Sequence, residues 1–397
     1  MAFEVPLGFR LAGLHCGIKS DVDKPDLTLI VTDRPATAAG VYTQNRIVAA
    51  PVTLDRERTP SDSIRAVVIN SGNANACTGD QGLNDAREMA HLAANTCDAT
   101  PEQALVLSTG IIGEFLPMEK ITQGIAAAQE KLGDDSESLT SAARGMMTTD
   151  TVEKLAGRKV QLASGEASVV GMAKGAAMIG PNMATMLGVI LTDASLSPQD
   201  AQITLTEAVR DSFNCISVDG HMSTNDTVLL LASGALSSAP LASNDLSAFS
   251  EALQQVCMEL ARAIPADGEG AEHLITIDVE GCIDRDTAHK IAKTVAESPL
   301  VKTAIAGADP NWGRIVSAAG YSGVPFHPAG VDLLVNGTLL YEQGAPVEFD
   351  ESSISDSIRN NRETSIILRF REGNERLRFW TTDLTAEYVR LNADYHT

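Results

Sequence analysis

The chain has 397 residues, of which 44% are hydrophobic and 21% charged, a balance typical of a globular protein large enough for two domains. Its net charge of −22 argues against polyanionic partners, so we expect neither a nucleic acid nor an anionic membrane surface. No apolar stretch approaches the ~20 residues that a membrane helix needs, and from Met1-Ala2-Phe3-Glu4 we expect no signal peptide.

The cysteines and histidines show no spacing typical of a metal site. Six cysteines contain no CxxC pair, and seven histidines form neither an HxxxH nor an HExxH pattern. We therefore expect reduced thiols, a cytoplasmic location and no metal cofactor.

Short apolar runs alternate with amphipathic helical patterns in the first half of the chain. The pattern predicts strands at residues 27–32, 66–70 and 105–108, and helices at residues 84–96 and 117–132. The apolar face of the helix at 84–96 would consist of Ala86, Met89, Ala90 and Ala93.

The second half of the chain begins with a continuous apolar run, Met186 to Leu191, which predicts a buried strand. Ser197 before Pro198 is typical of a capped helix start. We expect this helix to reach Phe213, with an apolar face made of Ile203, Leu205, Val209 and Phe213.

The later segments also contain both predicted helices and predicted strands. The pattern predicts helices at residues 244–263, 286–298 and 385–392, and strands at residues 331–335, 366–370 and 377–381. Together these elements predict a mixed α/β fold with segregated sheets.

A lone threonine separates a glycine-spaced loop from the apolar run in KGAAMIGPNMATMLGVILT, residues 174–192. The glycines match GxxxxG, but Pro181 and Asn182 follow where a phosphate loop needs Lys-Ser/Thr, so a phosphate loop is not favoured. Thr185 can be a core residue whose hydroxyl bonds to a backbone carbonyl. It can also be a nucleophile, because a cut after Ala184 would free an α-amino group of pKa about 7.7–8.0 to act as its base.

Such a cut can be intramolecular. The Thr185 hydroxyl would attack the Ala184 carbonyl, and water would hydrolyse the resulting ester. A strained loop before this bond could raise the energy of the peptide, and a rigid strand after it would hold the new N-terminus in place.

The stretch KGAAMIGPNMATML resembles the processing-site signature of the ornithine acetyltransferase family, also called the bifunctional glutamate N-acetyltransferases of arginine biosynthesis. Further motifs that resemble this family follow the same order along the chain: GFRLAGLHCGIK, AAGVYTQN, NSGNANACTG, LSTGIIGE, MMTTDT, STNDT, DGEGAEHLI, ADPNWGRI and YVRLNADYHT. The resemblance therefore covers the whole chain.

The resemblance implies roles for particular residues. Thr185 would be the nucleophile, cut from Ala184, and Thr109 with Gly110 would form the oxyanion hole. Residues that match substrate-contact positions of the family are Thr148, Lys174, Thr185, Glu269, Asn392 and Thr397.

Ordinary structural roles are open for the same residues. Thr109 and Gly110 can form a turn at the end of a strand, and Thr148 can cap a helix. Lys174 can be a solvated surface lysine and Glu269 an exposed acidic turn residue. A chain end such as YHT is commonly frayed.

The resemblance also implies a two-domain α/β sandwich, cut into an α chain (residues 1–184) and a β chain (residues 185–397) that stay interleaved in an α2β2 heterotetramer. The reaction would be ping-pong, with acetyl passing from N-acetylornithine through Thr185 to glutamate. No cofactor is implied, and the motifs leave open whether acetyl-CoA is a second acetyl donor.

Two other functions are compatible with these residues: a self-processing aminopeptidase that hydrolyses its acyl-enzyme, and a metabolite-binding protein that never cuts itself.

The sequence also departs from the family in places. Residues 220–223 read Gly-His-Met-Ser where Gly-Asp-Thr-Ser is usual, Ala177 replaces a glycine, and Glu272-His273 stands where Thr-Lys is common. These departures bear on processing and on acceptor preference.

Overall fold

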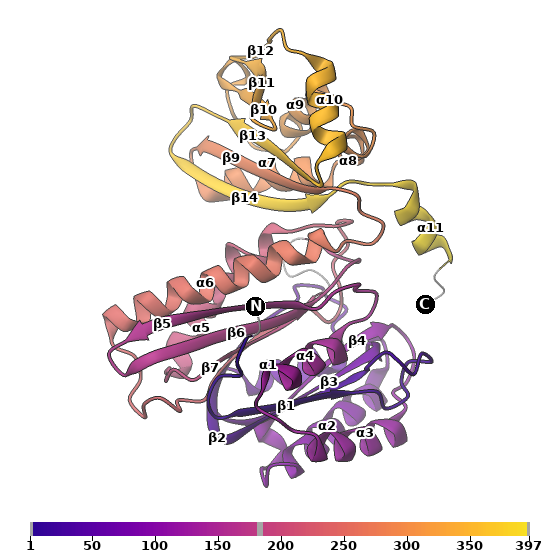
Figure 1. The fold of residues 1–397 in the computed structure, drawn as a ribbon, viewed down its shortest axis with the longest axis vertical. Coiled ribbons are helices and arrows are strands. Elements are labelled where there is room, and N and C mark those ends of the chain that lie inside the picture. Colours follow the sequence, from indigo (N-terminus) through magenta and orange to yellow (C-terminus); the bar gives the residue numbers. More distant parts are fainter. Residues whose placement is uncertain (1–2, 181–185, 395–397) are drawn as a thin grey trace.

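The computed structural model describes residues 3–180 and 186–394. Within them the chain forms two units, each built on one β-sheet (Figure 1). The first sheet has eight strands in the order β4-β3-β2-β8-β7-β6-β5, with β1 paired to β2. Its strands are β1 (Phe9–Leu14), β2 (Leu27–Tyr42), β3 (Ser61–Asn73), β4 (Ala104–Ile111), β5 (Lys154–Leu162), β6 (Gly165–Lys174), β7 (Leu187–Thr192) and β8 (Thr227–Ala232).

The first sheet folds back on itself. Strand β2 is long and its register shifts between Val31 and Ala38, which lets it pair with both halves of the sheet. Leu107 of β4 and Val189 of β7 belong to one buried cluster, so the two halves pack face to face. Helices cover the outer faces: α2 (Gly79–Asn95) and α3 (Met118–Glu130) on one half, α5 (Pro198–Arg210) and α6 (Ser243–Ala266) on the other.

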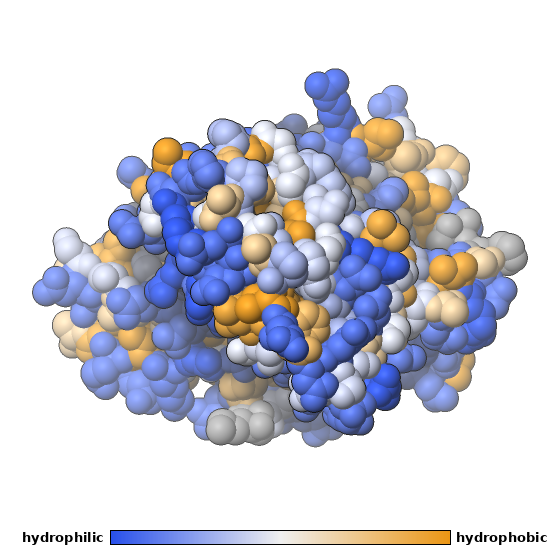
Figure 2. Space-filling model, turned by 90° about the horizontal axis from the view of Figure 1, so that it is seen from above, coloured by the Kyte–Doolittle hydropathy of each residue, from blue (hydrophilic) through white to orange (hydrophobic). Residues whose placement is uncertain are grey.

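The second sheet is also mixed and has six strands in the order β12-β11-β10-β13-β9-β14, with β9 parallel to β13 and antiparallel to β14. Its helices bury their apolar faces in one cluster with the sheet. Figure 2 shows that hydrophilic residues cover most of the face seen from above, where apolar residues form only small patches. The strands are β9 (Leu274–Cys282), β10 (Asp332–Val335), β11 (Thr338–Glu342), β12 (Ala345–Pro346), β13 (Glu363–Arg369) and β14 (Glu375–Thr382).

The remaining helices are distributed over both units. They are α1 (Ala50–Arg58), α4 (Ser136–Met146), α7 (Arg285–Glu297), α8 (Pro299–Ala306), α9 (Trp312–Gly320), α10 (Glu351–Asn360) and α11 (Ala386–Asp394), with the short 3-10 helices η1 (Pro101–Gln103), η2 (Phe213–Cys215) and η3 (Pro328–Gly330). None of the helices in the described ranges is long and apolar enough to cross a bilayer.

The predicted cut falls inside the first sheet. Strand β6 precedes it and β7 follows it, and the two strands pair antiparallel, with Lys174 opposite Leu187. Strand β7 also pairs in parallel with β8. Residues before and after the predicted cut therefore share one β-ladder, which would hold the two predicted chains together. The chain passes from the first structural unit to the second at a different point, between α6 and β9.

The mixed α/β fold and the buried strand after Met186 are confirmed. The predicted apolar face of α2 is buried, and the Ser197 side chain caps α5 by accepting from the Asp200 N–H. The predicted end of that helix is wrong, because α5 ends at Arg210 and the chain then turns into η2. Three of the four residues predicted to face inward, Leu205, Val209 and Phe213, are buried, while Ile203 is 48% exposed.

Candidate active site

Six of the predicted site residues line one cavity of about 320 Å³. They come from five separate places: β4, the loop after α4, the end of β6, the loop after α6, and α11. These residues are Thr109, Gly110, Thr148, Lys174, Glu269 and Asn392. The fold thus brings together residues that the sequence could connect only by resemblance, and their individual roles stay predictions.

Gly110 lies within β4, not in a turn after it. Its φ of 132° is a conformation that side chains rarely adopt, and an added Cβ would lie 2.3 Å from the carbonyl carbon of Gly72. The close approach of β3 and β4 therefore requires glycine here. As a result, the backbone of Gly110 borders the cavity without a side chain to screen it.

Lys174 is buried, so the interpretation as a solvated surface lysine is wrong. Its Nζ donates a hydrogen bond of 3.1 Å to Oγ1 of Thr109. An ammonium can only donate, so the Thr109 hydroxyl accepts here and keeps its own hydrogen for another acceptor. Burial lowers the pKa of Lys174, although the nearby Asp150 carboxylate opposes that shift.

Asp150 ties two segments of the cavity wall together. Its carboxylate accepts the Thr148 N–H at 3.0 Å and the Gly175 N–H at 2.6 Å. Burial would raise the pKa of Asp150, but the positive charges of Lys174 and Lys154 outweigh it and hold the pKa at about 2. Asp150 is therefore ionised at any physiological pH.

The ammonium of Lys154 joins this carboxylate to a third segment. Its Nζ lies 2.7 Å from Oδ1 of Asp150 and 2.6 Å from Oδ2 of Asp267, and the Lys154 side chain is only 1% exposed. Asp267 comes shortly before Glu269 in the chain. One buried cation thus fixes the loops that carry Thr148 and Glu269 relative to each other.

Helix α11, near the C-terminus, forms one wall of the cavity. Figure 1 shows it extending away from the second sheet towards the first unit. Asn392 Nδ2 donates to Oε2 of Glu269 at 3.1 Å, and the Tyr388 hydroxyl donates to Oδ2 of Asp219 at 3.2 Å. Tyr388 and Asn392 of α11 line the cavity, while Thr397 lies outside the described residues.

Ala184 and Thr185 also lie outside the described residues, but the described residues on either side are held by carboxylates. Asp219 accepts the Met178 N–H at 2.7 Å and the Ile179 N–H at 2.9 Å. Met178 has a φ of 57°, an uncommon conformation for a residue with a side chain. On the other side, Asp226 accepts the Met186 N–H at 3.1 Å. The predicted strain in the loop before the cut stays a prediction, because the described residues before the cut end at Gly180.

The sequence profile of the ArgJ family matches residues 10–397. The chain belongs to the ArgJ family. Over 99% of its length it is 48% identical to the arginine biosynthesis bifunctional protein ArgJ of Rhodopirellula baltica, covering 96% of that protein. It is 44% identical to the protein of the same name from Thermotoga neapolitana, covering 99% of this chain and 100% of the relative.

A solved ArgJ structure is also similar. The crystal structure of the arginine biosynthesis bifunctional protein ArgJ from Bacillus halodurans matches with a TM-score of 0.50 and 38% identity, covering 51% of this chain and 96% of that chain. The solved chain is therefore about half as long as this one. These comparisons confirm the family that the motifs predicted.

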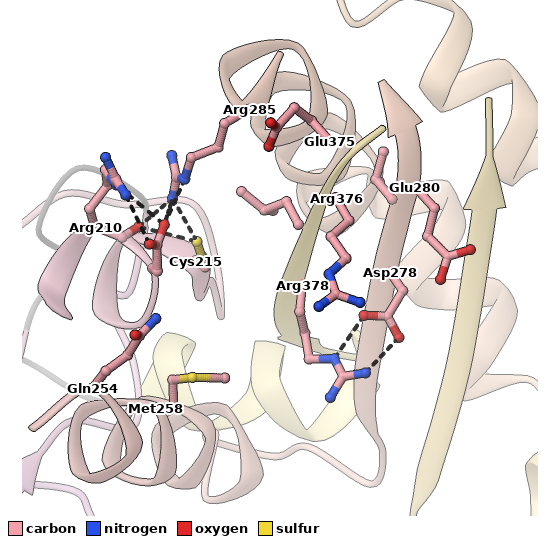
Figure 3. Close-up of a pocket in the computed structure, with 13 residues that line it drawn as sticks. Arg210, Cys215, Gln254, Met258, Asp278, Glu280, Arg285, Glu375, Arg376 and Arg378 are labelled. Carbon is pink, nitrogen blue, oxygen red and sulfur yellow. Dashed lines mark hydrogen bonds and ion pairs between the residues drawn. The ribbon is translucent and has the colours of Figure 1, made fainter. Parts of the chain in front are cut away.

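This ArgJ-family chain has a second, larger cavity of about 560 Å³, lined by residues of both units (Figure 3). None of the predicted site residues lines it. Arg378 makes hydrogen bonds of 2.7 and 3.0 Å to the Asp278 carboxylate, and Arg285 lies 2.6 Å from Asp211. Most of its charged groups therefore already neutralise one another.

No group of His, Cys, Asp and Glu side chains within the described ranges could hold a metal ion, and all six cysteines are free thiols.

Several residues in or near the first cavity of this ArgJ-family chain were given no role in the sequence analysis. Lys154, Asp150 and Asp219 were missed because their roles depend on contacts with residues far away in the chain, namely Asp267, Gly175 and Met178. Asn225 donates to the carbonyl oxygens of Ala74 and Ser108 at 2.6 and 2.8 Å, which fixes the wall beside Thr109. The STNDT motif, which contains Asn225, was the signal that could have found it. The cavity is also lined by residues of the departing stretches, Ala177, His221 and Ser223.

Proposed function

We propose that this chain is an acetyltransferase of arginine biosynthesis that moves acetyl from N2-acetyl-L-ornithine to L-glutamate. The observation that carries the proposal is the single cavity that gathers Thr109, Gly110, Lys174 and Glu269. Membership of the ArgJ family supports the same activity. The alternative of an aminopeptidase gains no comparable support.

The enzyme would first cut itself between Ala184 and Thr185. The Asp219 and Asp226 contacts support this step, because they fix Met178 before the bond and Met186 after it. The half-length solved chain from B. halodurans is consistent with a relative made of two chains. The α chain would comprise residues 1–184 and the β chain residues 185–397.

In the first half-reaction, the Thr185 hydroxyl attacks the acetyl carbonyl while its own α-amine takes the proton. Negative charge develops on the carbonyl oxygen. The free hydrogen of the Thr109 hydroxyl, polarised by Lys174, and the backbone at Gly110 would stabilise this charge. Ornithine leaves, and glutamate accepts acetyl from the Thr185 ester in the second half-reaction.

Charged groups of the cavity would orient the substrates. Lys174 would attract a carboxylate, and Glu269 would receive the δ-ammonium of the ornithine group. Thr148, Asn392 and Thr397 would add polar contacts. His221 and Ala177 line the same cavity and would influence which acceptor is preferred.

The reaction needs no metal or nucleotide cofactor, because the nucleophile, base and oxyanion donors are all protein groups. The bifunctional name of the relatives supports acetyl-CoA as a second acetyl donor, which would let the enzyme also make acetylglutamate directly. Two copies of each predicted chain would form an α2β2 heterotetramer in the cytoplasm.

Denaturing gels and an acetyl-transfer assay test the proposal together. Purified protein should run as two bands of comparable size, and acetylornithine with glutamate should give ornithine and acetylglutamate, with or without acetyl-CoA. Thr185→Ala should give one band and no transfer. Release of amino acids from peptides without acetylglutamate would instead identify the aminopeptidase. One wild-type band without transfer would identify a metabolite-binding protein.

A further inference from the structure

The Asn225 side chain lines the first cavity but has no role in the proposed mechanism. The residue is buried, with 5% of its surface exposed. Its Nδ2 donates to the Ala74 and Ser108 carbonyl oxygens at 2.6 and 2.8 Å, and its Oδ1 accepts the Thr224 hydroxyl at 2.5 Å. Carbonyl oxygens can only accept, so the amide nitrogen must face them, and both of its hydrogens are used.

These two hydrogen bonds hold both ends of the predicted oxyanion residues, Thr109 and Gly110. Ser108 directly precedes this pair, and its carbonyl group belongs to the peptide unit that carries the next N–H. Ala74 acts at the other end, because its N–H donates to the carbonyl oxygen of Ile111 at 2.8 Å, and Ile111 directly follows the pair. The amide therefore holds the residue before the pair directly and the residue after it through Ala74.

The same segment of the chain also holds the start of β7. Asp226, the next residue, accepts the Met186 N–H at 3.1 Å, and the Thr227 N–H donates to the Met186 carbonyl oxygen at 3.2 Å. Asn225, Asp226 and Thr227 thus connect β4 with the first described residue after the predicted cut. In the predicted two-chain enzyme these contacts cross from one chain to the other, because Asn225 follows the cut and Ser108 precedes it.

Two other buried asparagines near the oxyanion strand make contacts of a different kind. Asn70 donates to the Asn73 carbonyl oxygen and Asn75 to the Gly82 carbonyl oxygen, so each bonds within a few residues of its own position. Asn225 instead reaches residues that are 117 and 151 positions away in the chain. A local amide stabilises its own loop, whereas this amide sets the distance between two remote parts of the cavity wall.

We propose that Asn225 is a positioning residue for acetyl transfer: it keeps the Thr109 hydroxyl and the Gly110 backbone where negative charge develops on the acetyl oxygen. The inference rests on the proposed function, because these two residues are its proposed oxyanion hole. Such donors stabilise the transition state only when they are held in advance at hydrogen-bond distance. Loss of the amide would let β4 relax, whereas Lys174 and Glu269, which would attract the substrates, belong to other segments.

The test compares the steady-state kinetics of the wild type and Asn225→Ala, per amount of cut protein on denaturing gels. We expect kcat to fall by about 10- to 100-fold, because displaced oxyanion donors stabilise the transition state less well. The KM values for acetylornithine and glutamate should stay within about threefold, as for an interaction made only in the transition state. Asn336→Ala is the control: its amide also bridges two segments, at Ser357 and Ser365, but in the second unit. Its kcat should match the wild type.

A double-mutant cycle separates positioning from a general loss of structure. In a Thr109→Val background, where the hydroxyl is already absent, Asn225→Ala should lower kcat by less than about threefold further. A purely structural role would lower kcat by the same factor in both backgrounds.

Equal factors in the two backgrounds, an unchanged kcat in Asn225→Ala, or a change confined to KM would overturn the inference alone. A wild type without acetyl transfer would overturn the proposed function itself. If Asn225→Ala fails to fold, Asn225→Ser takes its place in the same cycle, because its smaller side chain can still donate to one carbonyl oxygen. Its kcat should also fall while its KM values stay unchanged.

Discussion

The two cavities differ less in size than in how their polar groups are satisfied. In the larger one, between the two units, Arg378 pairs with Asp278 and Arg285 with Asp211, in partly exposed positions. In the smaller one, the buried Lys174 donates to the Thr109 hydroxyl oxygen, and no residue within 3–180 and 186–394 accepts the hydrogen of that hydroxyl. The smaller cavity thus offers a hydrogen-bond donor that no described residue uses.

This difference favours the smaller cavity as the candidate active site more clearly than volume does. Exposed ion pairs contribute little to the free energy of unfolding, so their presence in the larger cavity does not mark a functional site. Buried charges destabilise the fold unless they are paired. Near the smaller cavity, the buried Lys154 ammonium is paired with the carboxylates of both Asp150 and Asp267. Four predictions test this contrast between the two cavities.

The largest effect is expected from Lys154→Met. The change would leave the Asp150 and Asp267 carboxylates buried near each other without their shared cation, which should lower the free energy of unfolding by about 3–5 kcal/mol. Urea unfolding measures this loss. Lys159→Met on the same strand is the control, because Lys159 is exposed and pairs with Glu166, and its unfolding midpoint should not move. Equal midpoints for the two variants would contradict the prediction.

Gly110→Ala should lower kcat by about 100- to 1,000-fold, because the new Cβ would push β4 away from Gly72 and displace the predicted oxyanion donors. Steady-state kinetics on fully processed protein measures the change. Gly113→Ala is the matched control: its φ of 91° is similarly strained, but nothing lies within 4 Å of the added Cβ. An undiminished kcat in Gly110→Ala would remove this residue from the site.

Asp150 should make the fold sensitive to acid. Its folded pKa of about 2 lies below its usual 3.8, so its carboxylate stabilises the fold above pH 4, and that stabilisation is lost as the pH falls towards 2. The loss should be about 2 kcal/mol. Urea unfolding between pH 5 and pH 2 should show this component in the wild type and lack it in Asp150→Asn. Identical pH dependence in both proteins would argue against the buried network.

The smallest effect is expected in the larger cavity. Arg378→Ala should lower the free energy of unfolding by less than about 1 kcal/mol, because its ion pair with Asp278 is partly exposed. The value of kcat/KM should stay within about twofold of the wild type. A large loss of transfer activity would show that the larger cavity takes part in the reaction.

Local patterns in the sequence were enough for much of the fold. The apolar run after Met186 and the spacing of apolar residues in α2 predict a buried strand and a one-sided helix, and both are present. The end of α5 was wrong because periodicity alone cannot detect where a chain must turn. Ile203 lies only two residues before Leu205, about 200° around the helix, so the two cannot share a face, and Ile203 is exposed while Leu205 is buried.

The site was predictable only in part. Motifs in a fixed order indicated the family and the residues that line one cavity. They gave no sign that Lys174 is buried, because an isolated lysine in a sequence looks the same whether it is solvated or paired. Asp226 likewise differs from other aspartates only through its surroundings.

By itself, the sequence determined the family, the alternation of helices and strands, and which side chains could act as nucleophile or charge partner. Those properties depend on residue identity and on near neighbours along the chain. The tertiary structure alone decided which charges are buried, which hydrogen-bond donors are left unused, and that both sides of the predicted cut belong to one sheet. Each of these depends on contacts between segments far apart in the chain, where burial changes the energy of a charge far more than local sequence does.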